Sequence, residues 1–346
     1  MNLPTPNAFN RGALDSNEVA ALRAAHYNAT LIASIDVTDS LRILRVCPDT
    51  AIGGYEAGQY TSLGLGYWEA RVPEADMESL DERRLRRLVR RPYSVSCSMI
   101  REEARPASTH APAKPKLAEA EPEMRLARVP DCDFLEFYVA LVLHAERRPP
   151  ALTPRLFHLQ VGDRLFVEPR FVGGYSLDAV QSDDNVVLFA TGTGEAPHNA
   201  MLAELLSRGH RGQIVSAVCV RWRKELAYLE THRRLERRYS NYRYLALTTR
   251  EPENLDRNHP AYVGKQYLQT FVASGEFERT VGWTLEPTRT HCFLCGNPAM
   301  IGAPHKLAGT NSFVPDPEGM IALLQSRGFQ SDLPHQPGNI HFERYW

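Results

Sequence analysis

The run Val186-Val-Leu-Phe-Ala-Thr-Gly192-Thr-Gly194-Glu-Ala-Pro197 decides the fold of the second half of the chain. Its continuous apolar residues predict a strand buried on both faces, and the glycines and proline predict a tight turn into a helix. Glycines let the backbone approach a phosphate closely, and the free N–H groups of a helix N-terminus favour an anion. The run predicts a pyrophosphate cradle, but it lacks the full GxGxxG pattern, so a tight strand-to-helix turn without a ligand stays open as an alternative.

Strands alternate with helices downstream of Gly173-Gly174. The expected strands are 185–190, 214–220, 244–248, 290–294 and 340–344, and the expected helices are 196–208, 224–238, 264–274 and 316–327. Alternation of this kind is typical of a mostly parallel sheet covered on both faces, which binds ligands at the carboxyl ends of its strands. We therefore predict an α/β, Rossmann-like domain over 185–346, preceded by a linker over 173–184.

The first half of the chain has a different pattern, in which short β-runs follow one another with few helices. The runs cover 31–37, 41–46, 59–65, 93–99, 134–143 and 163–167. This succession is typical of an antiparallel β-barrel, which we place over 29–172. Residues 1–28 form an extension that is partly helical around 18–26.

Two insertions interrupt the predicted barrel. The first, about 69–90, is rich in charge and predicts a short exposed helix. The second, about 101–130, is dense in Ala, Pro, Glu and Lys and predicts a flexible segment that buries little surface.

Length and composition exclude several classes of protein. A chain of 346 residues fits two domains, and 43% hydrophobic with 23% charged residues is an ordinary globular balance. The net charge of -1 gives no overall field for nucleic acid. No apolar run approaches the roughly 18 residues that span a bilayer, and Met1–Arg23 lacks an apolar signal core. We expect a soluble, cytoplasmic monomer with no membrane span and no nucleic-acid partner.

The 6 cysteines do not form the dense pattern of a disulfide scaffold, and we expect them to be reduced. Cys292 and Cys295 have the spacing of half a zinc site or a redox dithiol, but no second CxxC or HxxxH accompanies them. The favoured interpretation is two thiols near the end of a buried strand. No metal site is expected.

Arginines beyond the predicted strand ends indicate which nicotinamide nucleotide is bound. Arg221 follows one strand end directly, and Arg250 comes just after Thr248-Thr249. The 2′-phosphate of NADP is a dianion that arginine recognises well, whereas an NAD site would place an acidic residue near the ribose. Phosphorylated nicotinamide is therefore preferred, although surface arginines are usually only solvated.

Two further segments suggest a flat, phosphorylated cofactor. In Arg91-Pro-Tyr93-Ser94, an arginine can hold a diphosphate, a tyrosine can lie on a flavin face and a serine can hydrogen-bond the flavin edge. At the other end, Phe342-Glu343-Arg-Tyr345-Trp346 carries terminal aromatic side chains that would cover a flat group. Each segment alone would be unremarkable as strand composition.

Together, these motifs resemble the ferredoxin/flavodoxin-NADP(H) reductase family, in particular its bacterial members. The resemblance covers roughly 29–346 and rests on collinear segments: Arg91-Pro-Tyr93-Ser94, Glu136-Phe-Tyr-Val139, Leu152-Thr-Pro-Arg155-Leu156, Gly162-Asp163, Ala190-Thr-Gly-Thr-Gly194 with Ala196-Pro197, Glu225-Leu-Ala-Tyr228, Thr249-Arg250-Glu251, Cys295-Gly-Asn-Pro298 with Met300, and Glu343-Arg-Tyr-Trp346. It implies a β-barrel FAD domain followed by an NADP domain.

The resemblance also implies a role for individual residues. For FAD it implies Arg91, Pro92, Tyr93, Ser94, Phe137, Tyr138, Val139, Leu152, Thr153, Thr193, Tyr345 and Trp346. For NADP(H) it implies Thr191, Gly192, Thr193, Gly194, Arg221, Thr249, Arg250, Lys265, Gly296, Asn297 and Met300. The catalytic residues it implies around nicotinamide and flavin N5 are Ser94, Cys295 and Glu343.

The activity implied by the resemblance is hydride transfer between NADP(H) and flavin N5, with electrons passed to a one-electron carrier. That carrier would be an acidic ferredoxin or flavodoxin, which the arginines of Arg83–Arg91 would attract. The alternative is a quinone, flavin or dye reductase of the same fold. Glu195 departs from the family, which usually has an apolar residue there; we expect its carboxylate to weaken nucleotide binding unless it points to solvent or caps the helix.

Overall fold

The computed structural model describes residues 14–101, 125–128, 132–306, 313–333 and 335–344. Contacts within the chain divide it into two compact units. Unit 1 comprises Met1–Gly53, Tyr60–Tyr93 and Val139–Phe171, and unit 2 comprises Gly54–Gln59, Ser94–Tyr138 and Val172–Trp346. The chain therefore passes between the units several times, and 54–59 and 94–138, expected in the barrel, cluster with the C-terminal unit.

The first sheet has six strands in the order β4-β3-β8-β1-β2-β7. Its strands are β1 (Ala29–Thr38), β2 (Leu41–Pro48), β3 (Tyr60–Gly66), β4 (Leu88–Ser94), β7 (Leu135–Ala140) and β8 (Arg164–Val167). The pairings β1–β2, β1–β8 and β3–β8 are antiparallel, which confirms the predicted antiparallel architecture. Strand β4 begins in unit 1 and ends in unit 2, and β7 begins in unit 2 and ends in unit 1, so these two strands carry the chain between the units.

Helix α1 (Ser16–His26) forms the described part of the N-terminal extension, as predicted for 18–26. Asp15 and Glu18 cap its first turn reciprocally, which satisfies two N–H groups that the helix leaves unpaired. On the same unit, Glu69 accepts hydrogen bonds from Arg23 Nε and from the Tyr27 hydroxyl, both at 2.8 Å. The start of the first insertion is thereby tied to the extension.

The first insertion contains the short exposed helix expected within 69–90, α2 (Glu82–Leu85), which precedes β4. The residues before α2 in this segment are non-helical. Glu78 accepts from Arg155 Nη2 at 2.7 Å, and the Arg155 side chain is only 2% exposed. A buried charge needs a partner of this kind, so the segment follows its ion pairs rather than helical spacing.

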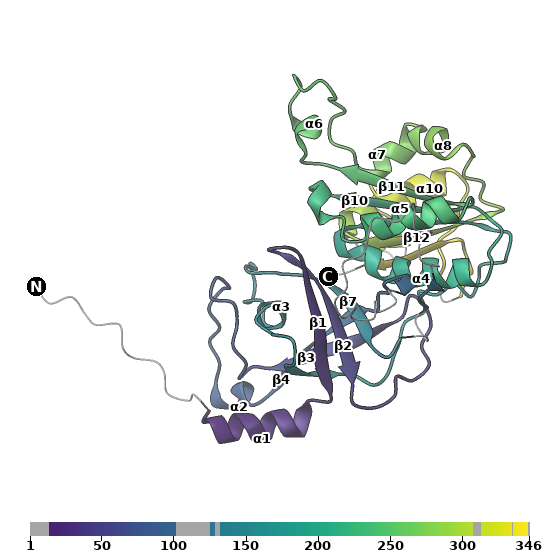
Figure 1. The fold of residues 1–346 in the computed structure, drawn as a ribbon. Helices are drawn as coiled ribbons and strands as arrows, with labels where there is room; N and C mark the ends of the chain where they lie inside the picture. The colour runs from purple at the N-terminus through teal and green to yellow at the C-terminus, as the bar shows by residue number, and fades with distance from the viewer. Residues whose placement is uncertain (1–13, 102–124, 129–131, 307–312, 334, 345–346) are drawn as a thin grey trace, which may run out of the picture. The chain divides into compact units, whose positions relative to one another are not determined.

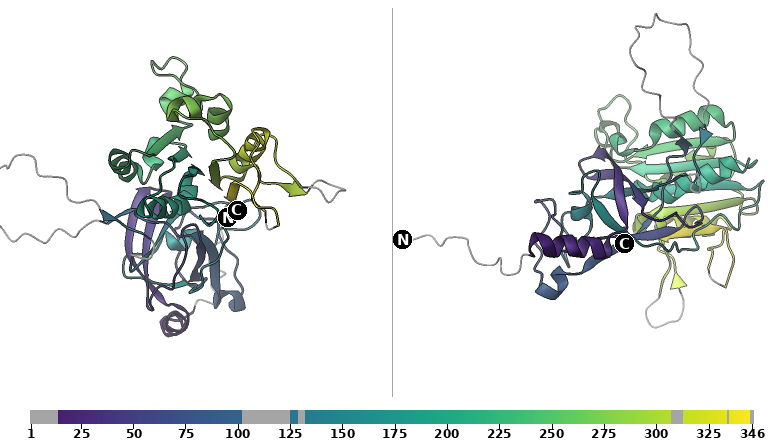
Figure 2. Two further views of the ribbon diagram at one scale, coloured as in Figure 1. Left: turned by 90° about the vertical axis from the view of Figure 1, so that its right-hand side faces the viewer. Right: turned by 60° about the horizontal axis from the view of Figure 1, so that its bottom comes forward.

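The second sheet lies within unit 2 and has the order β11-β10-β9-β12-β15, with every neighbouring pair parallel. Its strands are β9 (Asn185–Thr191), β10 (Ile214–Val220), β11 (Tyr242–Thr248), β12 (Thr290–Gly296) and β15 (Ile340–Arg344). Helices lie on both faces of this sheet (Figures 1 and 2). The predicted Rossmann-like layout is confirmed, and Cys292 and Cys295 are buried on β12 and form no disulfide.

The remaining elements of the described chain are helices, 3₁₀ turns and two pairs of two-residue strands. The helices are α3 (Thr153–Leu156), α4 (Glu195–Ser207), α5 (Leu229–Arg238), α6 (Pro252–Leu255), α7 (Leu268–Ala273), α8 (Glu276–Val281), α9 (Pro298–Ile301) and α10 (Met320–Ser326), with 3₁₀ turns η2 (Gly192–Gly194) and η3 (Arg223–Glu225). Two small hairpins are β5 (Ile100–Arg101) with β6 (Arg125–Leu126), and β13 (His305–Lys306) with β14 (Phe313–Val314). None of the described helices is long and apolar enough to cross a membrane.

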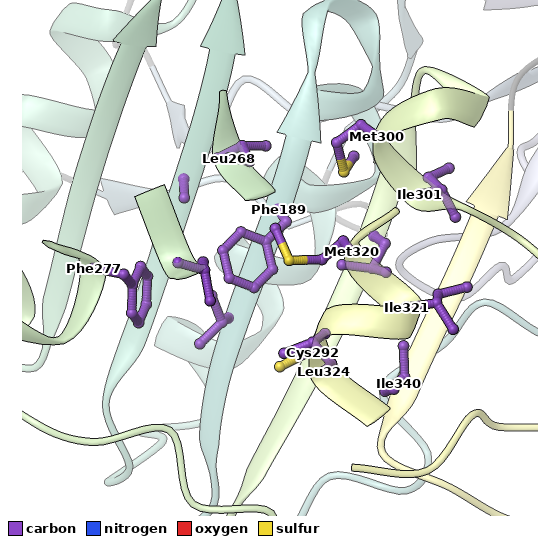
Figure 3. Close-up of a cluster of buried hydrophobic side chains, with 14 of the residues drawn as sticks. Phe189, Leu268, Phe277, Cys292, Met300, Ile301, Met320, Ile321, Leu324 and Ile340 are labelled. Carbon is purple, nitrogen blue, oxygen red and sulfur yellow. The ribbon is translucent and has the colours of Figure 1, made fainter. Parts of the chain in front are cut away.

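One face of the parallel sheet packs against α7, α8, α9 and α10. Phe189 and Cys292 of the strands contact a cluster that includes Leu268, Phe277 and Met320 (Figure 3). Helices α4 and α5 contact β9, β10 and β11. Their contacts include tyrosines of β11 that alternate with the residues of the apolar cluster, so the two groups of helices cover opposite faces.

Candidate functional site

The carboxyl ends of the five parallel strands bring most of the predicted nucleotide residues to one edge of the unit 2 sheet. Thr191 ends β9, and the loop Gly192–Gly194 follows it into α4. Gly194 has no room for a side chain, since an added Cβ would lie 2.3 Å from the carbonyl oxygen of Cys295. Gly192 has φ +53, and a Cβ added there would meet no described atom within 4 Å. The loop is thus packed against β12 on one side and open to a ligand on the other.

The first turn of α4 has no side-chain cap, because Gly194 is the N-cap. An uncapped helix N-terminus next to an open glycine loop fits an anionic group such as a diphosphate. Gly296, with φ +123, completes the loop: an added Cβ would lie 2.3 Å from Thr191 Oγ1. The Thr191 hydroxyl accepts from the backbone N–H of Asn297 at 2.7 Å, so the ends of β9 and β12 are fixed to each other.

The basic residues predicted for a 2′-phosphate lie on adjoining segments beyond β10 and β11. The backbone N–H of Arg250 donates to the carbonyl of Arg221 at 2.9 Å, and that of Gln266, next to Lys265, donates to Thr248 at 3.3 Å. The Arg221 guanidinium is 51% exposed and is oriented by Glu225 at 2.6 Å. Three cationic side chains therefore come from one small region of the sheet edge.

Glu225 was not among the predicted site residues. Its carboxylate accepts from Arg221 Nε and from the backbone N–H groups of Arg221 and Trp222, at 2.9, 2.9 and 3.2 Å. The spacing of four between Arg221 and Glu225 was the signal in the sequence that could have revealed this pair. Glu225 limits the guanidinium to a narrow set of orientations.

The three predicted catalytic residues also converge within unit 2. Ser94 Oγ donates to Glu343 Oε2 at 2.8 Å, although the two residues are 249 apart in sequence. Cys295 is the direct register partner of Glu343 between β12 and β15. Ser94 is 5% exposed and Cys295 is fully buried, while Glu343 is partly buried. A hydroxyl, a thiol and a carboxyl are thus held within one cluster.

Burial determines the protonation of this cluster. It raises the pKa of the Glu343 carboxyl above its ordinary value, and the hydrogen bond from Ser94 opposes that rise. A carboxyl whose pKa is raised keeps its proton to a higher pH than an ordinary glutamate does, which suits a group that holds a proton beside Ser94.

Glu195 neither points to solvent nor caps α4. It is 1% exposed, and its Oε1 accepts from the Tyr244 hydroxyl at 2.9 Å and lies 2.9 Å from His232 Nε2. The Tyr242 hydroxyl is 2.7 Å from His232 Nδ1, and the His232 ring stacks on Tyr244 with centroids 4.1 Å apart. The first residue of α4 is therefore anchored to α5 and β11, on the face of the sheet that α4 and α5 cover.

A second buried polar group was not predicted from the sequence. The Tyr228 hydroxyl donates to Glu136 Oε1 at 3.0 Å and lies 3.2 Å from Ser96 Oγ, and Ser96 accepts from Asn199 Nδ2 at 3.4 Å. Because Ser94 and Ser96 are two apart on an extended segment, their side chains share a face. Ser96 thus joins this group to the segment that carries Ser94, and its bond from Asn199 links that segment to α4.

The flavin-side residues of unit 1 are placed on β4, β7 and α3. Arg91 and Tyr93 are two apart on β4 and share a face; Arg91 is exposed and Tyr93 half-buried. Leu152 is buried before α3, and Thr153 Oγ1 bonds to the backbone of Val142. The pairing of an exposed arginine with a tyrosine fits a diphosphate next to an aromatic ring.

Several remaining predicted residues are buried. Phe137, Tyr138 and Val139 lie in β7, with the Tyr138 hydroxyl donating to the Glu225 carbonyl at 2.9 Å. Met300, predicted for NADP(H), lies on α9, and its side chain packs into the apolar cluster (Figure 3). Tyr345 and Trp346 fall outside the described residues.

Comparisons with known proteins agree with this geometry. Residues 188–306 match a family model described as an oxidoreductase NAD-binding domain. A flavodoxin/ferredoxin–NADP reductase of Buchnera aphidicola (subsp. Schizaphis graminum) is 26% identical over 213 residues, 61% of this chain and 72% of that protein. The enzyme of the same name from Escherichia coli is 30% identical over 175 residues, 50% of this chain and 65% of its own.

The chain is similar in sequence to flavodoxin/ferredoxin–NADP reductases over half or more of its length.

Solved structures show that the fold extends over nearly the whole chain. A ferredoxin NADP⁺ reductase from Neisseria gonorrhoeae, with bound FAD and NADP, covers 92% of this chain and 97% of its own, with a TM-score of 0.63 at 17% identity. A ferredoxin-NADP⁺ reductase from Plasmodium falciparum with 2′P-AMP gives a TM-score of 0.57 at 14% identity, covering 93% and 97%. The likeness in fold to these reductases therefore includes both the antiparallel and the parallel sheet.

Proposed function

We propose that this protein transfers electrons between NADP(H) and an acidic one-electron carrier, a ferredoxin or flavodoxin, through bound FAD. The observation that carries this proposal is the convergence of Ser94, Glu343 and Cys295 at the strand ends that also bear the open glycine loop. When bound, FAD supplies the chemistry that couples a two-electron hydride donor to a one-electron acceptor.

The two cofactors have separate holding groups. Arg91 would hold the FAD diphosphate and Tyr93 would cover its ring, since both are on one face of β4. The Gly192–Gly194 loop and the first turn of α4 would hold the NADP diphosphate. Arg221, Arg250 and Lys265 would hold the 2′-phosphate, with Glu225 fixing the orientation of Arg221.

The catalytic cluster would orient the reacting groups and hold a proton. Ser94 donates a hydrogen bond, and Glu343 keeps that hydroxyl in place and can exchange a proton with it. Cys295 is fully buried and contributes a small, polarizable surface rather than a nucleophile. Burial of these groups excludes water from the reaction.

Arg250→Ala is expected to raise the KM for NADPH about tenfold or more while leaving the KM for NADH nearly unchanged, because only NADPH carries the 2′-phosphate. Steady-state kinetics with both nucleotides measures the two values. Arg243→Ala, which removes an exposed arginine at the start of β11, is the matched control and should change neither value. Equal increases for NADPH and NADH would remove Arg250 from the 2′-phosphate site.

The carrier is tested through the exposed arginines of unit 1. Arg83 and Arg87 are exposed near Arg91, whereas Arg86 is paired with Glu18 and Glu82. Replacing Arg83 and Arg87 with Glu should raise the KM for an acidic ferredoxin or flavodoxin roughly tenfold at low salt, and the difference should shrink at high salt.

The assay is NADPH-dependent cytochrome c reduction with and without added carrier. The matched control reverses Arg147 and Arg148, which are exposed in the same unit, and should leave the KM for the carrier unchanged. If no carrier accelerates the reaction of the unmodified protein while a quinone or free flavin does, the protein is a reductase of the alternative type.

A further inference from the structure

Two cysteines of unit 2, Cys97 and Cys132, influence each other and hydrogen-bond to the same short stretch of backbone. Cys97 Sγ donates to the carbonyl of Ala127 at 2.7 Å, and Cys132 Sγ donates to the carbonyl of Arg128 at 3.5 Å. Their acceptors are consecutive residues, so the two sulfurs lie near the same point of the chain. Neither cysteine has a part in the proposed electron transfer.

The pair lies at the base of the second insertion. Cys97 precedes β5 and Cys132 follows β6, and these two strands pair as Ile100 with Leu126. The hairpin brings together the two points at which the chain leaves for and returns from residues 102–124. A bond between the two sulfurs would therefore join the segment before β5 to the segment after β6.

The backbone at this point is held in an uncommon conformation. Met99 has φ +62, the one positive φ of a non-glycine residue in the described chain, and its side chain is fully buried. Its N–H donates to Cys97 Sγ at 3.3 Å, and its carbonyl accepts from Ala127 at 2.9 Å. A conformation of this kind costs about 1–3 kcal/mol and persists only where the surroundings enforce it, as they do here around the Cys97 sulfur.

The two thiols differ in exposure and in charge. Cys97 is 3% exposed, whereas Cys132 is partly exposed. Contact with Cys132 and burial both raise the pKa of Cys97, with Glu136 adding a smaller repulsion. Cys97 therefore holds its proton more tightly than an ordinary cysteine, and Cys132 is the sulfur that solvent reaches. An accessible thiol beside a buried one is the arrangement of an attacking and a resolving cysteine.

We propose that Cys97 and Cys132 form a reversible disulfide beside the paired strands β5 and β6 when the protein meets a peroxide. The Cys132 thiolate attacks one oxygen of hydrogen peroxide, the O–O bond breaks, and Cys132 becomes a sulfenic acid as hydroxide leaves. The Cys97 thiol then attacks that sulfur and the S–O bond breaks. Two thiols and one peroxide give one disulfide and two waters, and a small dithiol reverses the reaction by exchange.

The experiment uses the folded, FAD-loaded protein. It is treated with a small excess of hydrogen peroxide, its remaining thiols are alkylated, and the tryptic peptides are analysed by mass spectrometry without reduction. The expected result is one peptide pair joined through Cys97 and Cys132, formed in proportion to the loss of two free thiols and removed by dithiothreitol. This readout needs no variant, so it does not depend on whether a substituted protein folds.

Two variants separate the roles of the sulfurs. In Cys97→Ser the sulfenic acid at Cys132 has no resolving partner, and its trapping by dimedone should increase about tenfold over the unmodified protein. Cys47→Ser, which removes a partly exposed thiol of unit 1, should form the same linked peptides as the unmodified protein. The proposal fails if Cys132 is oxidised to sulfinic acid without a linked peptide, or if both thiols remain alkylatable while Cys47 is oxidised.

Discussion

Ser94→Ala is expected to lower kcat about a hundredfold with a much smaller change in the KM for NADPH. The substitution removes the hydroxyl that donates to Glu343 at 2.8 Å, and a positioned hydrogen-bond or proton-transfer group typically contributes a factor of about 10²–10⁴. Stopped-flow measurement of flavin reduction by NADPH gives the rate of the chemical step directly. The matched control is Ser326→Ala, whose hydroxyl bonds only to a carbonyl of its own helix, α10, at 2.7 Å.

Glu343→Gln tests the proton in the same cluster. Because burial raises the pKa of Glu343, the pH profile of kcat for the unmodified protein should have a limb above the ordinary range of a carboxyl group. The amide keeps the shape and an oxygen acceptor for Ser94 but cannot titrate, so this limb should disappear.

If Ser94→Ala only loses FAD, with the rate of the loaded protein unchanged, Ser94 binds the cofactor and has no role in the chemical step.

Glu195→Ala is expected to destabilise unit 2 by about 3 kcal/mol. It leaves His232 and the Tyr244 hydroxyl without their shared acceptor in a site that is 1–2% exposed, and removal of one partner from a buried pair costs about 3–5 kcal/mol. For a unit of this size the corresponding fall in Tm is roughly 6–12 °C. Differential scanning calorimetry at saturating FAD measures this change.

Two substitutions in the same helix calibrate the result. Glu195→Gln keeps an oxygen that can accept from both partners and should cost much less. Glu204→Ala removes an exposed pair with Arg208, four residues along α4, and should cost about 0.5 kcal/mol or less. A Glu195→Ala protein with unchanged Tm would mean that the buried network does not stabilise the start of α4.

Local patterns in the sequence predicted the elements that form the nucleotide side of the site. The strand-to-helix run at Val186–Pro197 gave β9, the glycine loop and α4 because apolar runs and glycines act over a few residues. Boundaries were less well predicted: the helix expected over 224–238 begins only at Leu229, after a 3₁₀ turn in which Glu225 binds Arg221 instead of continuing the helix. Met300, which the resemblance assigns to NADP(H), lies on α9 with its side chain in the apolar cluster, and its assignment stays a prediction.

The sequence by itself determined an antiparallel domain, a parallel α/β domain, a glycine loop at the start of a helix and cations at the strand ends, because each follows from periodicity or from residue type at a short spacing. Only the tertiary structure decided that Ser94 contacts Glu343 across 249 residues and that Cys295 lies beside it. It also decided that Glu195 turns inward to His232 and that Cys97 meets Cys132. These contacts depend on strand register and on the burial of charge, which the whole core fixes and no short segment encodes.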